Sequence, residues 1–211
     1  MPTFVQVAPS NYKGLSPPTA FTLNDFTTPF QMITEMYAIP KYKEVNPSVF
    51  ACITFPFLFS VMFGDIAHGL VVLTLSTAVV FAEPKVRPTL PKDSLLHMVF
   101  DLRYLFLLMG LFTVYCGFIY NDFASIPLWI YSCYVYTEGN DEPSRLPDCV
   151  HMPGLDPAWY ISTNEITYQN SFKMKVAVII GVCHMSMGII MKAFNSVYFG
   201  SKVDFFFEFC P

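Results

Sequence analysis

Charged residues are scarce in this chain of 211 residues, and that scarcity narrows the class of protein at once. Asp, Glu, Lys and Arg make up 13% of the sequence, against roughly 25% in a typical globular domain. The chain has no dense run of Lys or Arg and a formal net charge of -4, which argues against nucleic acid as the main partner. Intrinsic disorder is excluded because it requires few aromatic residues, whereas this chain has 22 Phe and 12 Tyr.

Motifs for catalysis and cofactor binding are equally scarce. The sequence contains no phosphate-binding glycine loop, no HExxH and no GxSxG, the patterns that indicate nucleotide binding, zinc hydrolysis and serine hydrolysis. No two cysteines stand at CxxC spacing, so a zinc or redox site of that kind is not indicated. We therefore expect no cofactor, no metal site and no catalytic residue, and an enzyme is the least supported class.

Hydrophobic residues, in contrast, make up 54% of the chain and gather in four stretches without Asp, Glu, Lys or Arg: Val45–Gly64, Ile66–Ala82, Tyr104–Asn121 and Val176–Met191. A helix of roughly 20 residues crosses a bilayer core about 30 Å thick. The first and third stretches fit directly, and the second and fourth need a flanking turn or a locally thinner bilayer. The sequence predicts an all-α, polytopic transmembrane helical bundle with about four spans.

The basic residues predict an orientation, because Lys and Arg are retained on the cytosolic side. Lys41 and Lys43 precede the first span, and segment 122–172 carries one basic residue against seven acids. Lys173 and Lys175 oppose this orientation, since they would lie at the lumenal mouth of the fourth span. The expected organisation, with both ends cytosolic, is a cytosolic approach 1–44, spans one to three within 45–121 with a cytosolic loop 83–103, an acidic lumenal loop 122–172, span four 173–192 and a cytosolic tail 193–211.

A short amphipathic helix is predicted before the first span. Thr28-Pro29-Phe30-Gln31 has the form of a helix start, with a hydroxyl cap and proline in the first turn. Ile39-Pro40 ends the element. The helix fits a position on the cytosolic surface or on a partner, and it fits packing on the chain's own loops equally well.

Two features mark the segment predicted to be lumenal. Ile126 to Tyr136 is apolar and aromatic, which is typical of an interfacial or re-entrant stretch, because Trp and Tyr favour the headgroup zone. Cys133 and Cys149 both lie in this segment. A disulfide between them is one expectation in an oxidising lumen, and two free thiols are the other.

Ionisable side chains at membrane depth are costly and are therefore candidates for function. Asp65 and His68 stand three residues apart where the first two spans meet, a spacing that lets a carboxylate and an imidazole relay a proton on one helical face. His184 lies near the middle of the fourth span. The sequence favours structural roles for all three: Asp65 capping the second helix in a turn between Gly64 and Gly69, and His184 packing with satisfied hydrogen bonds.

Small residues and one proline bear on how the spans pack. Glycines inside the spans allow helices to approach closely, and four are available: Gly110, Gly117, Gly181 and Gly188. Pro56 should kink the first span, because it removes a backbone donor.

Several long strings carry a family resemblance. Tyr42 to Gly69 reads YKEVNPSVFACITFPFLFSVMFGDIAHG, and Leu107-Leu108-Met109-Gly110 leads to Gly117-Phe118-Ile119-Tyr120-Asn121-Asp122-Phe123. Further on stand Asp156-Pro157-Ala158-Trp159 and Gly181-Val182-Cys183-His184-Met185. In this order they resemble subunit a of the eukaryotic vacuolar-type proton ATPase, the large membrane subunit of its Vo sector, from its first to its fourth span.

The resemblance implies a role that composition does not show. Subunit a is the stator beside the rotating proteolipid c-ring of the pump and offers protons two aqueous half-channels. It implies the c-ring, the other Vo and V1 subunits and the lipid bilayer as partners, and a vacuolar or other acidic endomembrane as the location. ATP hydrolysis would take place on other subunits.

The family's essential arginines lie on later helices than the four matched here, and none of Arg87, Arg103 and Arg145 falls inside a predicted span. No catalytic residue is therefore carried over from the resemblance. Two other functions remain open. One is a truncated, non-conducting paralogue that acts in assembly. The other is an independent small protein that conducts protons or ions with Asp65, His68 and His184.

Overall fold

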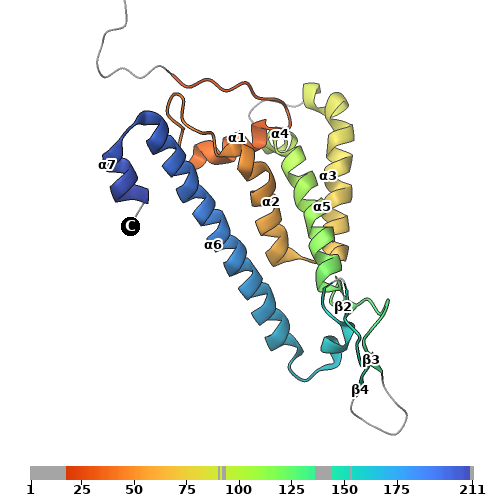
Figure 1. The fold of residues 1–211 in the computed structure, drawn as a ribbon. Helices are drawn as coiled ribbons and strands as arrows, with labels where there is room; N and C mark the ends of the chain where they lie inside the picture. Colours follow the sequence, from red (N-terminus) through yellow and green to blue (C-terminus); the bar gives the residue numbers. More distant parts are fainter. Residues whose placement is uncertain (1–17, 90, 92–93, 136–143, 153, 210–211) are drawn as a thin grey trace, which may run out of the picture.

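The computed structural model describes residues 18–89, 91, 94–135, 144–152 and 154–209, and these are mostly helical. Four long helices run in alternating directions (Figure 1): α2 (Ser48–Phe63), α3 (Ile66–Val86), α5 (Arg103–Tyr120) and α6 (Glu165–Phe199). One end of this bundle, here called the loop side, carries the described residues between 121 and 164 (Figure 1). The other end, here called the terminal side, carries the N-terminal approach, the link from α3 to α5 and the C-terminal elements.

The shorter elements divide between these two ends. On the terminal side lie α1 (Thr28–Tyr37), the 3₁₀ turn η1 (Arg87–Thr89), α4 (Leu95–Asp101), α7 (Lys202–Asp204) and the π-helical turn η3 (Phe205–Phe209). The loop side has two antiparallel pairs and a 3₁₀ turn: β1 (Asp122–Phe123) with β2 (Ile126–Pro127), β3 (Tyr134–Val135) with β4 (Ser144–Arg145), and η2 (Pro157–Ile161).

Three helices of the described chain are long and apolar enough to cross a membrane: Ile66–Thr89, Arg103–Tyr120 and Glu165–Phe199. Helix α2 has 16 residues, which is about 24 Å at 1.5 Å per residue, short of a bilayer core of about 30 Å. The first stretch, expected to fit directly, therefore gives the shortest helix. The helix begins after Pro47 and ends before Gly64. The first three residues of the charge-free stretch, 45–47, and its last residue, Gly64, therefore lie outside the helix.

Helices α3 and α6 are longer than their charge-free stretches. Helix α3 continues past Ala82 to Val86, and α6 begins at Glu165 rather than at residue 173 and extends to Phe199. Long charged side chains lie along apolar surface while their heads reach water, so a helix can continue beyond the residues that fit in hydrocarbon. Residues 165–172 and 193–199 are thus helix, where a loop and a tail were expected.

Close packing of α3 against α5 depends on glycine. A Cβ atom added to Gly117 of α5 would overlap the backbone of Ile66 at the start of α3, and one on Gly110 would lie 2.8 Å from the Leu73 nitrogen. Gly181 and Gly188 of α6, in contrast, have no such atom within 4 Å in the described structure. Two of the four glycines named from the sequence therefore make close helix contacts, and the two on α6 do not.

The buried core lies where α2, α5 and α6 meet near the loop side. Val61, Cys116, Tyr120 and Leu155 form it, and Phe172 and other residues of α6 pack on it from outside. The Tyr120 hydroxyl donates a hydrogen bond of 2.8 Å to the Val61 carbonyl. This bond satisfies a polar group that would otherwise be costly inside the bundle.

Helix α1 forms where the sequence predicts it, but its start differs in detail. The N-cap is Thr27 rather than Thr28, without a side-chain cap hydrogen bond, and both threonine hydroxyls donate instead to the Asn24 carbonyl. Phe30 is fully buried against the chain itself, whereas Tyr37 is 85% exposed. Packing on the chain's own elements thus accounts for the Phe30 face of α1.

An ion-paired arginine joins α3 to α5 at the terminal side. Arg103, the first residue of α5, is only 3% exposed, and its Nε lies 2.9 Å from a carboxylate oxygen of Glu83 on α3. Its Nη1 donates to the Phe100 carbonyl at 2.9 Å. Glu83 also accepts a hydrogen bond of 2.7 Å from Arg87. The arginine is at a helix edge, as expected, and its charge is neutralised within the chain.

Candidate functional site

Asp65 connects three parts of the loop side. It is the N-cap of α3 and accepts a hydrogen bond of 2.9 Å from the Ala67 amide. The same carboxylate accepts a second bond of 2.9 Å from the Ala124 amide in the turn between β1 and β2. Its other oxygen contacts Nδ1 of His68. Asp65 therefore holds the β1–β2 turn against the start of α3.

The electrostatics of Asp65 suit an anchor that stays charged. Burial of the carboxyl favours its neutral form, but hydrogen bonds from Ala124, His68 and Ala67 favour the ionised form and together hold the pKa of Asp65 below its usual value. The His68 side chain is 63% exposed, against 14% for Asp65. The pair thus combines a fixed negative charge with an imidazole open to the loop-side medium.

Lys173 lies beside this anchor. Its Nζ is 3.7 Å from a carboxylate oxygen of Asp122 and 5.0 Å from the centroid of the Tyr120 ring. Its charge is therefore paired with a carboxylate of β1 and an aromatic face at the end of α5.

Tyr160 of η2 adds a phenol to the same region. Burial, reinforced by the negative charges of Asp122, Glu165 and Asp65, raises the pKa of Tyr160, while the neighbouring Gln169 side chain acts in the opposite direction. The phenol therefore stays neutral at any physiological pH. We call Asp65, His68, Asp122, Tyr160 and Lys173 the loop-side polar cluster. The partners of Asp65 and Asp122 stand about 50 to 60 residues away in sequence, and spacing alone gives no signal for them.

His184 is not part of the loop-side polar cluster. Its Nε2 lies 3.1 Å from the Thr54 hydroxyl, in a contact that joins α6 to α2. Thr54 precedes Asp65 by about three helical turns, which is roughly 16 Å along the axis. The structure therefore brings Asp65 and His68 together and places His184 at a different depth.

One buried hydroxyl pair lies between these two levels. Ser60 of α2 and Thr113 of α5 are within 3.2 Å of each other and almost fully buried. Each hydroxyl also donates to a carbonyl of its own helix at 2.7 Å, Ser60 to Pro56 and Thr113 to Met109.

Within the described residues, no group of three or more His, Cys, Asp and Glu side chains is arranged to hold a metal ion.

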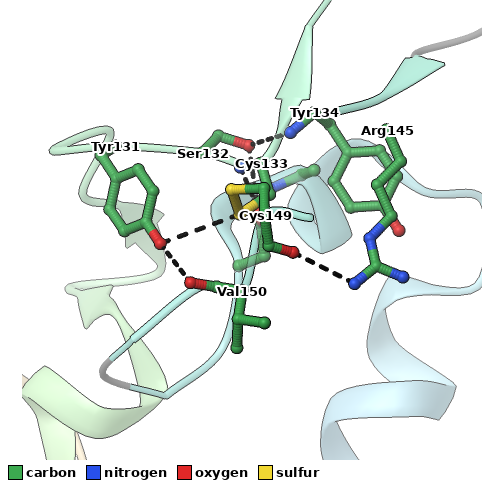
Figure 2. Close-up of a disulfide and its surroundings, with 9 residues drawn as sticks. Tyr131, Ser132, Cys133, Tyr134, Arg145, Cys149 and Val150 are labelled. Atoms are coloured by element: carbon green, nitrogen blue, oxygen red, sulfur yellow. Dashed lines mark hydrogen bonds between the residues drawn. A yellow bond between two sulfur atoms is a disulfide. The ribbon is translucent and has the colours of Figure 1, made fainter. Parts of the chain in front are cut away.

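A disulfide between Cys133 and Cys149 closes the loop-side segment (Figure 2). The two Cα atoms are 5.6 Å apart, and the bond ties the residue before β3 to the loop that follows β4. Two hydrogen bonds lie beside the disulfide. The Tyr131 hydroxyl donates to the Val150 carbonyl at 2.6 Å, and Arg145 donates to the Cys149 carbonyl at 3.2 Å (Figure 2).

Asp156 fixes the closed segment to the base of α6. It is 7% exposed and accepts hydrogen bonds from the Ser132 hydroxyl at 2.7 Å, the Cys133 amide at 3.0 Å and the Ala158 amide at 2.9 Å. Trp159, three residues on, stacks on Tyr168 of α6 with ring centroids 4.1 Å apart. The disulfide, Asp156 and this aromatic stack therefore form one connected unit.

Removing the disulfide should loosen the loop side without unfolding the bundle. A crosslink that closes about 15 residues contributes about 3 kcal/mol in the chain-entropy description, so we expect Cys133→Ser to speed proteolysis within 122–164 several-fold. Cys183→Ser is the matched control, because Cys183 is an exposed free cysteine on α6. Peptide mapping without reductant should recover the linked pair, and recovery of two unlinked thiols from oxidised membranes would contradict the bond.

Acid should loosen the same unit only at low pH. Burial opposes ionisation of Asp156, but hydrogen bonds from Ala158, Ser132 and Cys133, with the charge of His151, hold its pKa below the ordinary value, which is about 3.9. Because the folded-state pKa is the lower one, the stabilisation is complete above the unfolded-state pKa and is lost as pH falls through the folded-state value.

We therefore expect Trp159 emission, followed in a Trp129→Phe background, to stay constant between pH 7 and pH 5 and to change below about pH 4. Asp156→Asn should already show the loosened signal at pH 7. If the change in Trp159 emission of the Trp129→Phe protein has its midpoint between about pH 5 and pH 6, Asp156 is not the group that titrates.

The described chain has three long apolar helices and, at one end, a polar segment closed by a disulfide. The first residue of one of these helices is held in a buried ion pair. Together these features define a class of protein: a polytopic helical membrane protein. The polar groups lie at the ends of the helices, as the hydrogen bond between Asp65 and Ala124 and the ion pair between Lys173 and Asp122 show.

Comparison with known proteins identifies the family. The family described as "V-type ATPase 116kDa subunit family" matches residues 1–211. The chain is 40% identical over 203 residues to V-type proton ATPase subunit a3 of Arabidopsis thaliana, covering 93% of the chain and 25% of that protein. It is 39% identical to V-type proton ATPase 116 kDa subunit a 1 of Mus musculus (93% and 26%) and 38% identical to V-type proton ATPase subunit a of Schizosaccharomyces pombe (100% and 25%). The chain belongs to this family and spans about a quarter of the length of these relatives.

Proposed function

We propose that the chain is a membrane-embedded segment of the stator subunit of a vacuolar-type proton pump, in which it supports Vo assembly and proton translocation. The observation that carries the proposal is the identity of about 40% across 93% of the chain to proteins named as V-type proton ATPase subunit a. The location that follows is an acidic endomembrane such as the vacuole. ATP hydrolysis belongs to other subunits of the complex.

The proposed topology has four passes, both ends cytosolic and the disulfide-closed segment in the lumen. Two observations support four passes with both ends on one side. The four long helices alternate in direction, and the terminal side gathers both ends of the described chain (Figure 1). The orientation itself rests on the basic residues of the sequence, which Lys173 and Lys175 oppose. Helix α2 would cross as the shortest pass, with α1 and the residues before it at the cytosolic surface.

The role proposed within the pump is structural. Arg103 is buried and already paired with Glu83, so it is not available to a carboxylate on another subunit. Helix α6 leaves a broad apolar face open, with Val178, Val182 and Met185 each more than 50% exposed. We propose that the proteolipid c-ring, other Vo subunits and lipid cover this face, and that the chain needs them for any activity.

Co-purification tests this function. The tagged chain, solubilised gently from endomembranes, should recover the proteolipid ring and other pump subunits. The matched control is Met185→Arg, which places a charge on the open face of α6 at a position 64% exposed and should reduce recovery of the ring at least severalfold. Recovery of the folded chain without any pump subunit would overturn the proposal.

A second candidate function is an independent proton path through Asp65, His68 and His184. The hydroxyl pair of Ser60 and Thr113 between the two levels is the observation that favours it. The lowered pKa of Asp65 is the observation against it, because a proton carrier must be protonated during each cycle. The distance of roughly 16 Å between Thr54 and Asp65 would also have to be bridged by water.

Proton flux into liposomes separates these two functions. We expect vesicles containing the chain alone to acidify no faster than protein-free vesicles. Asp65→Asn and His184→Ala should leave that baseline unchanged, and Asp65→Asn is a clean test because Asn is as good an N-cap as Asp. A flux well above baseline that both variants abolish would establish the proton path instead.

A further inference from the structure

An exposed apolar segment on the loop side has large side chains that the described part of the chain does not cover. It runs from Ile126 to Tyr131 and is called here the aromatic loop. Ile126 is 64% exposed, Trp129 51% and Ile130 79%. Large apolar side chains gathered in this way usually mark a contact with a membrane or another protein.

The fold places the aromatic loop next to the ends of the spans. Pro127 is paired with Asp122, which follows the end of α5 by two residues, and Ala124 is bonded to Asp65 at the start of α3. Trp129 is two residues beyond Pro127, so it lies at most about 7 Å from that strand pair even if the chain is extended. A tight turn, in which the Ile130 amide donates to the Leu128 carbonyl at 2.9 Å, shortens this reach.

This position coincides with the headgroup zone. The zone is roughly 5 to 8 Å thick on each side, given a hydrocarbon core of about 30 Å and a total thickness of about 40 to 45 Å. The loop-side ends of α3 and α5 mark one boundary of the core, because both helices are long and apolar enough to cross it. Residues within about 7 Å of these ends therefore lie in the headgroup zone rather than in bulk water.

The chemistry of the aromatic loop suits lipid as its occupant. No charged residue stands between Asp122 and Glu138, and Trp and Tyr are the residues that accumulate at both membrane interfaces. The loop is also held in place: the Tyr131 ring stacks on His151 at 4.7 Å between centroids, and its hydroxyl is bonded to Val150.

We propose that the aromatic loop inserts into the headgroup zone of the leaflet on the loop side and anchors the disulfide-closed segment to the bilayer surface. Trp129 and Ile130 are the inserted side chains. This inference rests on the membrane-spanning helices and the family, and not on the conduction of protons, so it stands or falls apart from the proposed function.

The two tryptophans of the chain supply the experiment and its control. The 211-residue protein is reconstituted into phosphatidylcholine vesicles whose acyl chains carry bromine, a quencher of tryptophan emission, either near the headgroups or near the methyl ends. Trp159→Phe leaves Trp129 as the only reporter, and Trp129→Phe leaves Trp159, which is stacked on Tyr168. If Trp159→Phe disturbs that stack, the difference between the parent protein and Trp129→Phe gives the signal of Trp129 without altering it.

Bromine near the headgroups (shallow bromine) should lower the emission of Trp129 by at least about twofold, because an interfacial ring lies at that depth. It should quench the emission of Trp159 several-fold less. Deep bromine should quench Trp129 less than shallow bromine. Two results would overturn the proposal. Equal quenching by aqueous iodide with and without vesicles would leave the loop in water, as a protein-docking surface would be in the isolated chain. Stronger quenching by deep bromine would make the segment re-entrant rather than interfacial.

A second variant checks that the loop itself holds Trp129 at the surface. Ile130→Asp places a charge beside Trp129 at a position 79% exposed, so it should not disturb the fold. We expect it to make Trp129 at least about twofold more accessible to iodide, because a charged side chain is expelled from the interface. An unchanged accessibility would contradict insertion of this side chain.

Discussion

Gly117→Ala should lower the midpoint of thermal unfolding in mild detergent by about 4 to 12 °C. The added methyl group would overlap the backbone of Ile66 and lie 2.7 Å from the Asp65 carbonyl carbon. Neither is the end of a flexible side chain, so α3 and α5 must separate. Overpacking of this kind costs about 2 to 3 kcal/mol, and each kcal/mol shifts the midpoint by about 2 to 4 °C for a chain of this size.

Gly181→Ala is the matched control for this prediction. It makes the same change in another long helix, but no atom outside that helix lies within 4 Å of the new methyl group. Alanine is the better helix former by up to about 1 kcal/mol, so the midpoint should stay constant or rise slightly. Equal losses at both positions would show that α3 and α5 do not pack through Gly117.

Arg103→Met should be the second severe change. It removes a guanidinium that is 3% exposed and leaves the Glu83 carboxylate, itself 19% exposed, with Arg87 as its remaining partner on this side of the bundle. Breaking a buried ion pair by removing one partner costs about 3 to 5 kcal/mol. We expect a fall of about 10 °C in the same detergent assay and poor recovery of folded protein from membranes.

Arg87→Met separates the effect of burial from that of charge. It also removes a positive charge from Glu83, but the Arg87 side chain is 36% exposed, and partly exposed pairs contribute about 0 to 1 kcal/mol. Its midpoint should therefore shift by no more than about 4 °C. Arg103→Lys should fall between the two, because an ammonium cannot reach both Glu83 and the Phe100 carbonyl in the same way. If Arg87→Met proves as damaging as Arg103→Met, net charge at this end governs stability instead of the buried pair.

The sequence located the helices well because the hydrophobic requirement is local. Each of the four charge-free stretches overlaps a long helix, and the resemblance to subunit a is confirmed by the family match. The ends of the helices were predicted less well. A charge-free run marks what fits in hydrocarbon, whereas a helix ends where its backbone groups find caps, as at Asn121 and Gly200, which both adopt left-handed conformations.

The contacts of the candidate site could not be predicted, because they join residues far apart in the chain. Nothing near Asp65 in sequence indicates that it accepts a bond from Ala124, and nothing near Lys173 indicates Asp122. The glycines illustrate the same limit. Gly117 and Gly181 have similar apolar neighbours in sequence, and only the packed structure distinguishes the one that a second helix touches.

The bond between Asp65 and Ala124 has a consequence for the order in which the chain is made. When α2 and α3 have left the ribosome, the carboxylate can already cap α3 through Ala67, but its second amide partner stands 59 residues further along. Gly69, whose close contacts are Val114 and Thr113, likewise has no helix to meet until α5 has emerged. The first helical hairpin should therefore persist as a loosely associated intermediate during synthesis, and arrival of the β1–β2 turn should convert it into the packed three-helix unit in a single step.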